Sequence, residues 1–234
     1  MSGGCNCTTR AIVLLSGGLD SLIAAHLAAC DHDLRLAITC DYGQRAAVAE
    51  IKAAAIQAAR LNIPHHVVNL PWLGDISAAA ITDPGAQMPH PQTAELDQHA
   101  VTAESARQVW VPNRNAVFVM VAGAYAEALE CDAIVAGFNA EEAATFADNS
   151  PEFVAAASNL LQYSAANQPT IVCPTLEMTK TEMVQLASER GIALDTLYSC
   201  YEVGPRHCWR CESCRRLQRA LTEAGQWETL GPCL

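Results

Sequence analysis

The turn at residues 16–21, with the sequence SGGLDS, constrains this chain more than any other stretch. It follows an apolar run, residues 11–15, that predicts a buried strand, and it precedes an Ala- and Leu-rich run, residues 22–30, that predicts a helix. A glycine-rich turn between a strand and a helix gathers free backbone N–H groups at the positive end of the helix dipole. This point suits a phosphate or pyrophosphate, with Asp20 either capping the helix or lying near Mg²⁺.

Two other phosphate-binding loops are excluded by the same residues. No Lys-Ser or Lys-Thr pair follows the glycines, as a Walker A loop requires, and the G-x-G-x-x-G spacing of dinucleotide folds is missing. The pattern S-G-G-x-D-S instead resembles the PP-loop of the ATP pyrophosphatases. Members of that superfamily cleave ATP to AMP and pyrophosphate and transfer the adenylyl group to a substrate oxygen. The alternative is a plain strand–helix turn with a helix cap.

Strand and helix patterns alternate along most of the chain, which predicts an α/β fold with a parallel, doubly wound, five-stranded sheet. The expected later strands are residues 34–39, 65–70, 131–136 and 170–172, and the expected helices are 46–61, 116–130, 151–165 and 180–191. Residues 71–108 contain four prolines and little periodicity, which is typical of a lid or binding loop, although 94–106 could be helical. We expect one α/β domain at 1–195 and a small C-terminal segment at 196–234.

Polar residues follow the expected strands at the sheet edge where ligands bind in open α/β folds. Asp41, Tyr42, Gln44 and Arg45 come after the second strand. Gly137 and Asn139 follow the fourth, and Asp148 lies in a turn cluster beyond them.

Arg114 stands at the start of a predicted helix that Asn113 or Asn115 can cap. A cation at this end of a helix opposes the helix dipole, which makes Arg114 a candidate anion ligand. The alternative is a solvated surface arginine.

Four of the eleven cysteines lie within fifteen residues: Cys200, Cys208, Cys211 and Cys214. Two consecutive C-x-x-C steps can place three thiolates around one ion, and the loop from Cys200 can bring the fourth. Four thiolates favour structural Zn²⁺, with an iron–sulfur cluster as the competing interpretation. His207 could replace one cysteine only with strain.

The net charge of −11 argues against binding of a nucleic acid backbone, so a zinc-ribbon module that binds nucleic acid is the weaker hypothesis. No apolar run is long enough to span a bilayer, and residues 1–10 lack the apolar core of a signal peptide. We therefore expect a cytoplasmic protein without a membrane partner, in which a disulfide framework is not expected.

These motifs together resemble the 7-cyano-7-deazaguanine synthase family of the queuosine-precursor pathway, over nearly the whole chain. The matching pieces are residues 16–21, 41–45, 111–115 and 199–201, with Lys180, Cys208, Cys211 and Cys214. The chain departs from the family pattern at Ala46, where a histidine is usual. It departs again at residues 145–150, where Asp148 is kept but the usual cysteine and arginine are not.

The resemblance implies a fold like that of the adenine nucleotide alpha hydrolases and the activity of an ATP-dependent carbon–nitrogen ligase. The substrates would be 7-carboxy-7-deazaguanine, ammonia and ATP with Mg²⁺. The product would be 7-cyano-7-deazaguanine, formed through an adenylated carboxylate and an amide with release of AMP, or ADP-level products, and pyrophosphate. The resemblance also implies a homodimer. The alternative is another PP-loop adenylating enzyme with a different substrate, such as an amidating ligase or a tRNA thiolase.

The resemblance also implies roles for individual residues. The residues that would bind ATP are Leu14, Leu15, Ser16, Gly17, Gly18, Leu19, Asp20, Ser21, Asp41, Tyr42, Gln44, Arg45 and Gly137. The substrate would contact Arg114, Asn115, Asn139 and Asp148. Ser16, Asp20, Arg114 and Lys180 would be catalytic, and structural Zn²⁺ on the four cysteines would shape one wall of the pocket.

Overall fold

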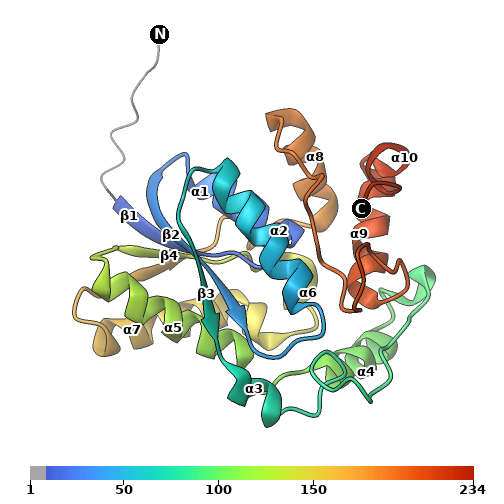
Figure 1. The fold of residues 1–234 in the computed structure, drawn as a ribbon, viewed down its shortest axis with the longest axis horizontal. Coiled ribbons are helices and arrows are strands. Elements are labelled where there is room, and N and C mark those ends of the chain that lie inside the picture. Colours follow the sequence, from blue (N-terminus) through green and yellow to red (C-terminus); the bar gives the residue numbers. More distant parts are fainter. Residues whose placement is uncertain (1–8) are drawn as a thin grey trace.

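The computed structural model describes residues 9–234 and contains a five-stranded sheet in the order β3-β2-β1-β4-β5 (Figure 1). Every neighbouring pair of strands is parallel, as the alternating pattern predicted. The N-terminal segment on which part of the cytoplasmic expectation depends lies mostly outside the described residues. The strands are β1 (Thr9–Leu14), β2 (His32–Asp41), β3 (His65–Asn69), β4 (Ala133–Val135) and β5 (Thr170–Val172).

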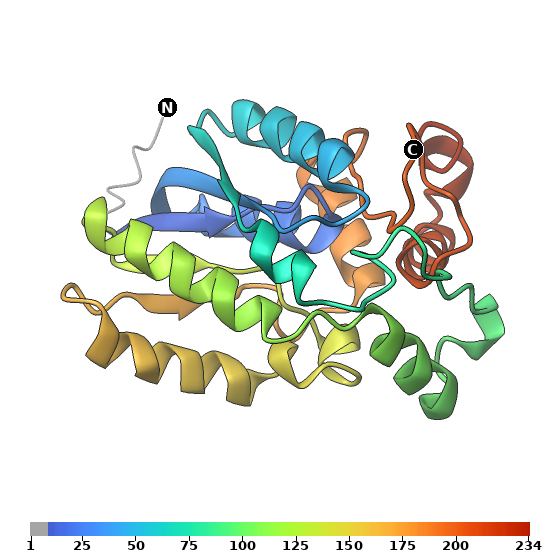
Figure 2. The ribbon, with the colours of Figure 1, turned by 60° about the horizontal axis from the view of Figure 1, so that its bottom comes forward.

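Helices cover both faces of the sheet, so the predicted doubly wound architecture is confirmed (Figure 2). Successive side chains of a strand point to opposite faces. Ile12 therefore packs with the helices of one face, and Val13 with those of the other. The first face carries α5 (Arg114–Ala128) and α7 (Pro151–Ser164), and the second carries α1 (Leu19–Ala28) and α2 (Ala47–Arg60).

The order of the strands places a topological switch between β1 and β4. The chain runs outward from β1 through β2 to β3, then crosses back to β4 and β5 on the other side. The loops that leave β1 and β4 therefore diverge, and such a point is where open α/β sheets bind ligands. The SGGLDS turn and the turn at Gly137 both lie there.

The proline-rich stretch after β3 is only partly irregular. It contains α3 (Pro71–Asp75), the 3₁₀ helix η1 (Thr93–Glu95) and α4 (His99–Val109). The helix expected at 94–106 therefore begins later and ends later, because η1 and its capping box occupy the first of these positions. Residues 76–92 remain without a helix or strand. In residues 9–234, no helix combines the length and the apolar character needed to cross a membrane.

The C-terminal segment contains α9 (Glu212–Glu223) and α10 (Trp227–Leu230), and it packs beside α8 (Lys180–Arg190). The three helices lie together at one side of the sheet (Figures 1 and 2). Leu217 of α9 shares an apolar cluster with Met183 of α8 and Leu19 of α1. The segment therefore has no core separate from the sheet domain, and the boundary at 195/196 stays a prediction.

Candidate active site

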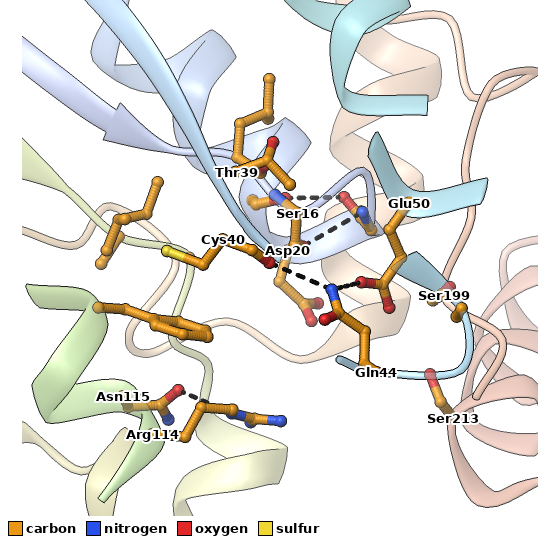
Figure 3. Close-up of a pocket in the computed structure, with 18 of the residues that line it drawn as sticks. Ser16, Asp20, Thr39, Cys40, Gln44, Glu50, Arg114, Asn115, Ser199 and Ser213 are labelled. Atoms are coloured by element: carbon orange, nitrogen blue, oxygen red, sulfur yellow. Dashed lines mark hydrogen bonds between the residues drawn. The ribbon is translucent and has the colours of Figure 1, made fainter. Parts of the chain in front are cut away.

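A cavity of about 230 Å³ opens at the carboxyl edge of the sheet, where β1 and β4 diverge. Figure 3 shows side chains that enter it from the turn after β1, from the end of β2 with the loop and helix that follow it, from the start of α5, and from the C-terminal segment. The polar and charged lining residues are Ser16, Asp20, Ser21, Thr39, Tyr42, Gln44, Glu50, Arg114, Asn115, Glu142, Asn149, Tyr198, Ser199, Tyr201 and Ser213.

The SGGLDS turn is held in shape by its own serines. Ser16 N–H donates to Ser21 Oγ at 3.2 Å, the two hydroxyl oxygens lie 3.1 Å apart, and Ser21 Oγ donates to the Gly18 carbonyl at 3.2 Å. The turn leads directly into α1, whose first N–H groups have no partner within the helix. The result is a cluster of N–H and O–H donors that suits an anion.

Two glycines allow the close approaches that this turn requires. Gly17 has φ +87°, and a Cβ there would lie 2.7 Å from the carbonyl oxygen of Glu50. A Cβ on Gly137 would lie 2.6 Å from the backbone nitrogen of Ser21. The end of β4 is therefore pressed against the first turn of α1, and the position admits only glycine without a backbone shift.

Lys180 is the buried cation of the site. Its side chain is 7% exposed, and its Nζ donates to Asp20 Oδ2 at 2.6 Å and to Glu142 Oε1 at 2.9 Å. The expected capping box of Thr179 and Glu182 is confirmed at the start of α8, and it places Lys180 as the first residue of that helix. Lys180 does not line the cavity itself, but it fixes two carboxylates that do.

The structure excludes one of the two roles considered for Asp20. The N-cap of α1 is Gly18, and Asp20 lies in the first turn instead of capping it. Asp20 Oδ2 is paired with Lys180, whereas Oδ1 is buried without a hydrogen-bond partner in the described part of the chain. Burial raises the pKa of Asp20 to about 6, because the Lys180 ammonium only partly offsets the cost of desolvating the carboxylate.

Arg114 is the first residue of α5 and lines the cavity, so it is not a solvated surface arginine. Its Nη1 lies 3.4 Å from the hydroxyl of Tyr42, and its guanidinium carbon lies 5.9 Å from the centre of that ring. The N-cap is Asn113 in a left-handed conformation with φ 59°, and its side chain makes no capping bond. Asn115 lies inside the helix and donates to the carbonyl of Asp148 at 3.3 Å.

Several residues that were expected to bind ATP or substrate lie outside this cavity. Arg45 donates to the carbonyls of Asp83 and Ala86, and so holds the proline-rich stretch. Asp41 accepts a hydrogen bond from Gly43 N–H at 3.1 Å. The cavity is also not lined by Gly17, Leu19 or Asn139, and Asp148 lines a smaller hollow beside Arg114.

Asn139 is the clearest difference from the expected substrate contacts. Its side chain is fully buried and accepts the N–H of Glu142 at 3.0 Å, which caps the short helix α6 (Ala140–Ala143). The position after β4 lies at the carboxyl edge of the sheet, as expected, but this side chain faces inward. Glu142, three residues later, is the one that lines the cavity.

Glu50 was missed by sequence reasoning and lies in the cavity wall. It comes from the first turn of the Ala-rich helix α2, and its Oε2 accepts from Gln44 Nε2 at 2.8 Å. Burial raises the pKa of Glu50 to about 7. The spacing in the sequence could have identified Glu50. A carboxylate six residues after Gln44 falls in the first turn of the next helix, above the same loop.

The four cysteines meet as the C-x-x-C spacing predicted. Their sulfur atoms all lie within 4.8 Å of one another, and those of Cys208 and Cys214 are 3.8 Å apart. Four thiolates about 2.3 Å from one tetrahedral ion stand about 3.8 Å apart, so the cluster fits a four-coordinate metal. Backbone N–H groups of Cys208 and Cys211 also donate to Cys200 Sγ and Cys208 Sγ at 3.3 Å each, as suits thiolate ligands.

The cysteine cluster borders the cavity. Ser199 and Tyr201 flank Cys200, Ser213 precedes Cys214, and all three flanking residues line the cavity. Residues next to the cysteines therefore form part of one cavity wall.

Comparison with known proteins finds relatives that match most of the chain. Residues 10–225 match the family model described as Queuosine biosynthesis protein QueC. A 7-cyano-7-deazaguanine synthase from Desulforamulus reducens is 46% identical over 216 residues, which are 92% of this chain and 95% of that protein. One from Methanosarcina mazei is 40% identical over 219 residues, with 92% and 95% covered. The solved NMN synthetase of Francisella tularensis is a distant likeness, with 15% identity, a TM-score of 0.47, and 94% and 85% covered.

Proposed function

The chain belongs to the QueC family of queuosine biosynthesis proteins, and from that membership we propose that it is an ATP-dependent ligase that forms 7-cyano-7-deazaguanine. The substrates are 7-carboxy-7-deazaguanine, ammonia and two molecules of ATP. The observation that carries the proposal is the cavity itself. In this one space, the donors of the SGGLDS turn face Arg114 of α5.

The reaction follows from the poor reactivity of a carboxylate. The substrate oxygen attacks the α-phosphorus of ATP, pyrophosphate leaves, and the carboxylate becomes an acyl adenylate. Ammonia attacks the carbonyl carbon, and AMP departs with the bonding electrons to leave an amide. The amide oxygen then attacks the α-phosphorus of a second ATP and a second pyrophosphate leaves. Loss of AMP and of two protons from nitrogen then leaves the nitrile.

The SGGLDS turn is suited to hold the departing pyrophosphate. Ser16, Ser21 and the N–H groups at the start of α1 are preorganised donors, and such donors stabilise charge that develops in the transition state. Arg114, on the opposite side, is suited to neutralise the negative charge of the α-phosphate oxygens or of the substrate carboxylate. Lys180 has a positioning role, because its ammonium group holds the carboxylates of Asp20 and Glu142 in place.

Two cations complete the proposal. Mg²⁺ fits Asp20, which belongs to the SGGLDS turn, lines the cavity, and has a buried Oδ1 without a hydrogen-bond partner in the described residues. When bound, Mg²⁺ neutralises phosphate charge and so assists departure of pyrophosphate. Zn²⁺ fits the four thiolates and has a structural role, since all four positions of a tetrahedral ion are taken by cysteines. We also propose that the enzyme is a cytoplasmic homodimer with no nucleic acid partner.

Exchange of labelled pyrophosphate into ATP tests the adenylation step without the later ones. We expect exchange that requires Mg²⁺ and 7-carboxy-7-deazaguanine, and exchange also with the corresponding amide. Exchange with other carboxylates and none with this one would favour the alternative, a PP-loop ligase with a different substrate.

A further inference from the structure

We propose that Glu50, oriented by Gln44, is the site at which this enzyme binds ammonium and removes its proton. The inference rests on the proposed function and assigns its second substrate to a place in the cavity. Ammonium is cationic at neutral pH, as a lysine side chain is, and it has no lone pair until it loses a proton. A ligase that takes up ammonium therefore benefits from a base at the reaction site that accepts that proton, and an anionic carboxylate both attracts the cation and accepts the proton.

Among the carboxylates that line the cavity, Glu50 differs from the others because it has no cationic side chain paired with it in the described residues. Of the three, Asp20 and Glu142 are both paired with the Nζ of Lys180. Within residues 9–234, no ion pair involves Glu50. The negative charge of Glu50 is therefore available to a small cation from the cavity.

Gln44 holds the Glu50 carboxylate in a fixed direction. The Gln44 side-chain oxygen accepts the N–H of Tyr42 at 2.9 Å, so its amide group has a defined orientation. Its nitrogen donates to the carbonyl of Cys40 at 3.1 Å and to Glu50 Oε2 at 2.8 Å. Figure 3 shows both contacts beside the SGGLDS turn. Gln44 satisfies one carboxylate oxygen, which leaves Oε1 for the ammonium.

The charged and titratable groups around Glu50 are few. Asp41 at the end of β2 disfavours its ionisation, and Arg114 of α5 favours it. The phenols of Tyr42 and Tyr198 also face it, and burial keeps both neutral by raising the pKa of each above its ordinary value. Because burial brings the pKa of Glu50 to about 7, the carboxyl is able both to accept a proton and to return it to solvent near neutral pH.

The proton balance of the reaction uses this group more than once. Ammonium gives one proton to Glu50 and becomes ammonia, whose lone pair forms the new carbon–nitrogen bond as the carbon–oxygen bond to AMP breaks. The added nitrogen then loses a second proton and becomes the amide. In the nitrile-forming half, two further N–H protons leave as the second AMP departs. Glu50 takes each proton in turn and releases it to water between steps.

The variant Glu50→Gln tests this proposal, because glutamine preserves the shape and the bond from Gln44 but can neither attract ammonium nor accept a proton. At pH 7 we expect kcat/KM for ammonium to fall by about 10²–10⁴-fold. Carboxylate-dependent pyrophosphate exchange, which needs no ammonium, stays within about a factor of two. The matched control is Glu189→Gln, the same change at an exposed position of α8.

Two further measurements decide whether Glu50 acts as a base or has only a structural role: the pH dependence of the rate of amide formation, and the rate with a second nucleophile. At a fixed total ammonium concentration, the wild-type rate of amide formation is level between pH 7.5 and 8.5. The rate of Glu50→Gln rises about tenfold over this range, because it depends on the concentration of free ammonia. Hydroxylamine is a weaker base that is unprotonated at neutral pH, so it bypasses the first proton transfer, and the variant's loss in the rate of hydroxamate formation is much smaller than its loss with ammonium. Glu50→Asp, which keeps a carboxylate, retains the level profile at a lower rate.

The outcomes distinguish the failure of this inference from the failure of the proposed function. Equal losses of exchange and amide formation in Glu50→Gln, a wild-type pH profile, or a loss with hydroxylamine as large as that with ammonium would overturn the assignment of Glu50. Absence of carboxylate-dependent exchange in the wild-type enzyme would instead overturn the proposed function.

Discussion

Replacing Glu50 by glutamine is expected to make the protein more stable, although it makes the enzyme slower. The pKa of Glu50 is raised from its ordinary 4.5 to about 7 because burial penalises the charged form. A carboxyl whose pKa is raised on folding contributes stability that is fully present below pH 4.5 and lost as the pH rises through about 7. The amide of Glu50→Gln does not titrate, so it escapes this loss.

The size of the effect follows from the displacement of the pKa. From 4.5 to about 7, the loss accumulates at about 1.36 kcal/mol per pH unit and reaches about 3 kcal/mol by pH 8. Below pH 4.5 it vanishes. Such a cost is tolerated at functional sites, where stability and activity oppose each other.

Urea denaturation followed by tryptophan fluorescence measures this difference. We expect the unfolding free energy of Glu50→Gln to exceed that of the wild type by an amount that grows from pH 5 to pH 7 and is constant above it. Glu189→Gln on the surface of α8 should show no such trend. A variant that is less stable than the wild type at pH 8, or a difference that does not change with pH, would refute the reasoning.

Three further changes test other parts of the structure. Gly137→Ala places a Cβ 2.6 Å from Ser21 N, and we expect it to lower the unfolding free energy in urea by about 1–3 kcal/mol and to abolish pyrophosphate exchange. Exchange at the wild-type rate would contradict the close approach. Lys180→Met leaves two buried carboxylates without their cation, and we expect a loss of about 3–5 kcal/mol at pH 8 that shrinks toward pH 5 as they protonate; unchanged stability at pH 8 would argue against the network. Cys208→Ser should abolish bound metal in elemental analysis and lower the unfolding free energy, whereas retained metal would exclude Cys208 as a ligand.

Much of the fold could be predicted because buried parallel strands leave a clear trace in the sequence. β1, β2 and β4 contain short apolar runs, and each is followed by a polar or glycine-containing turn, whereas β3, with the sequence HHVVN, is less apolar. The limits of the elements were less predictable. The helix expected from residue 22 begins at Leu19, because the glycines before it supply the turn and no side-chain cap marks the start. The short helix α6 was missed, since four residues are too few for a periodic pattern.

The site was predictable where local sequence determines geometry. The SGGLDS turn, Arg114 at a helix start and the closely spaced cysteines all act through neighbours in the chain. The pairing of Lys180 with Asp20 joins residues 160 positions apart, and only the packing of α8 against α1 brings them together. The direction of a side chain is equally hidden, as Asn139 and Glu142 show on one short turn.

The most direct test of the proposed reaction follows the two carboxylate oxygens of the substrate. Purified enzyme is given 7-carboxy-7-deazaguanine labelled with ¹⁸O in both carboxylate positions, together with ATP, Mg²⁺ and ammonium, and the products are examined by mass spectrometry. Successive adenylation of a carboxylate and an amide predicts one nitrile and two AMP for each substrate, with one ¹⁸O in each AMP. Label in ADP or phosphate, or a nitrile formed without labelled AMP, would contradict this mechanism.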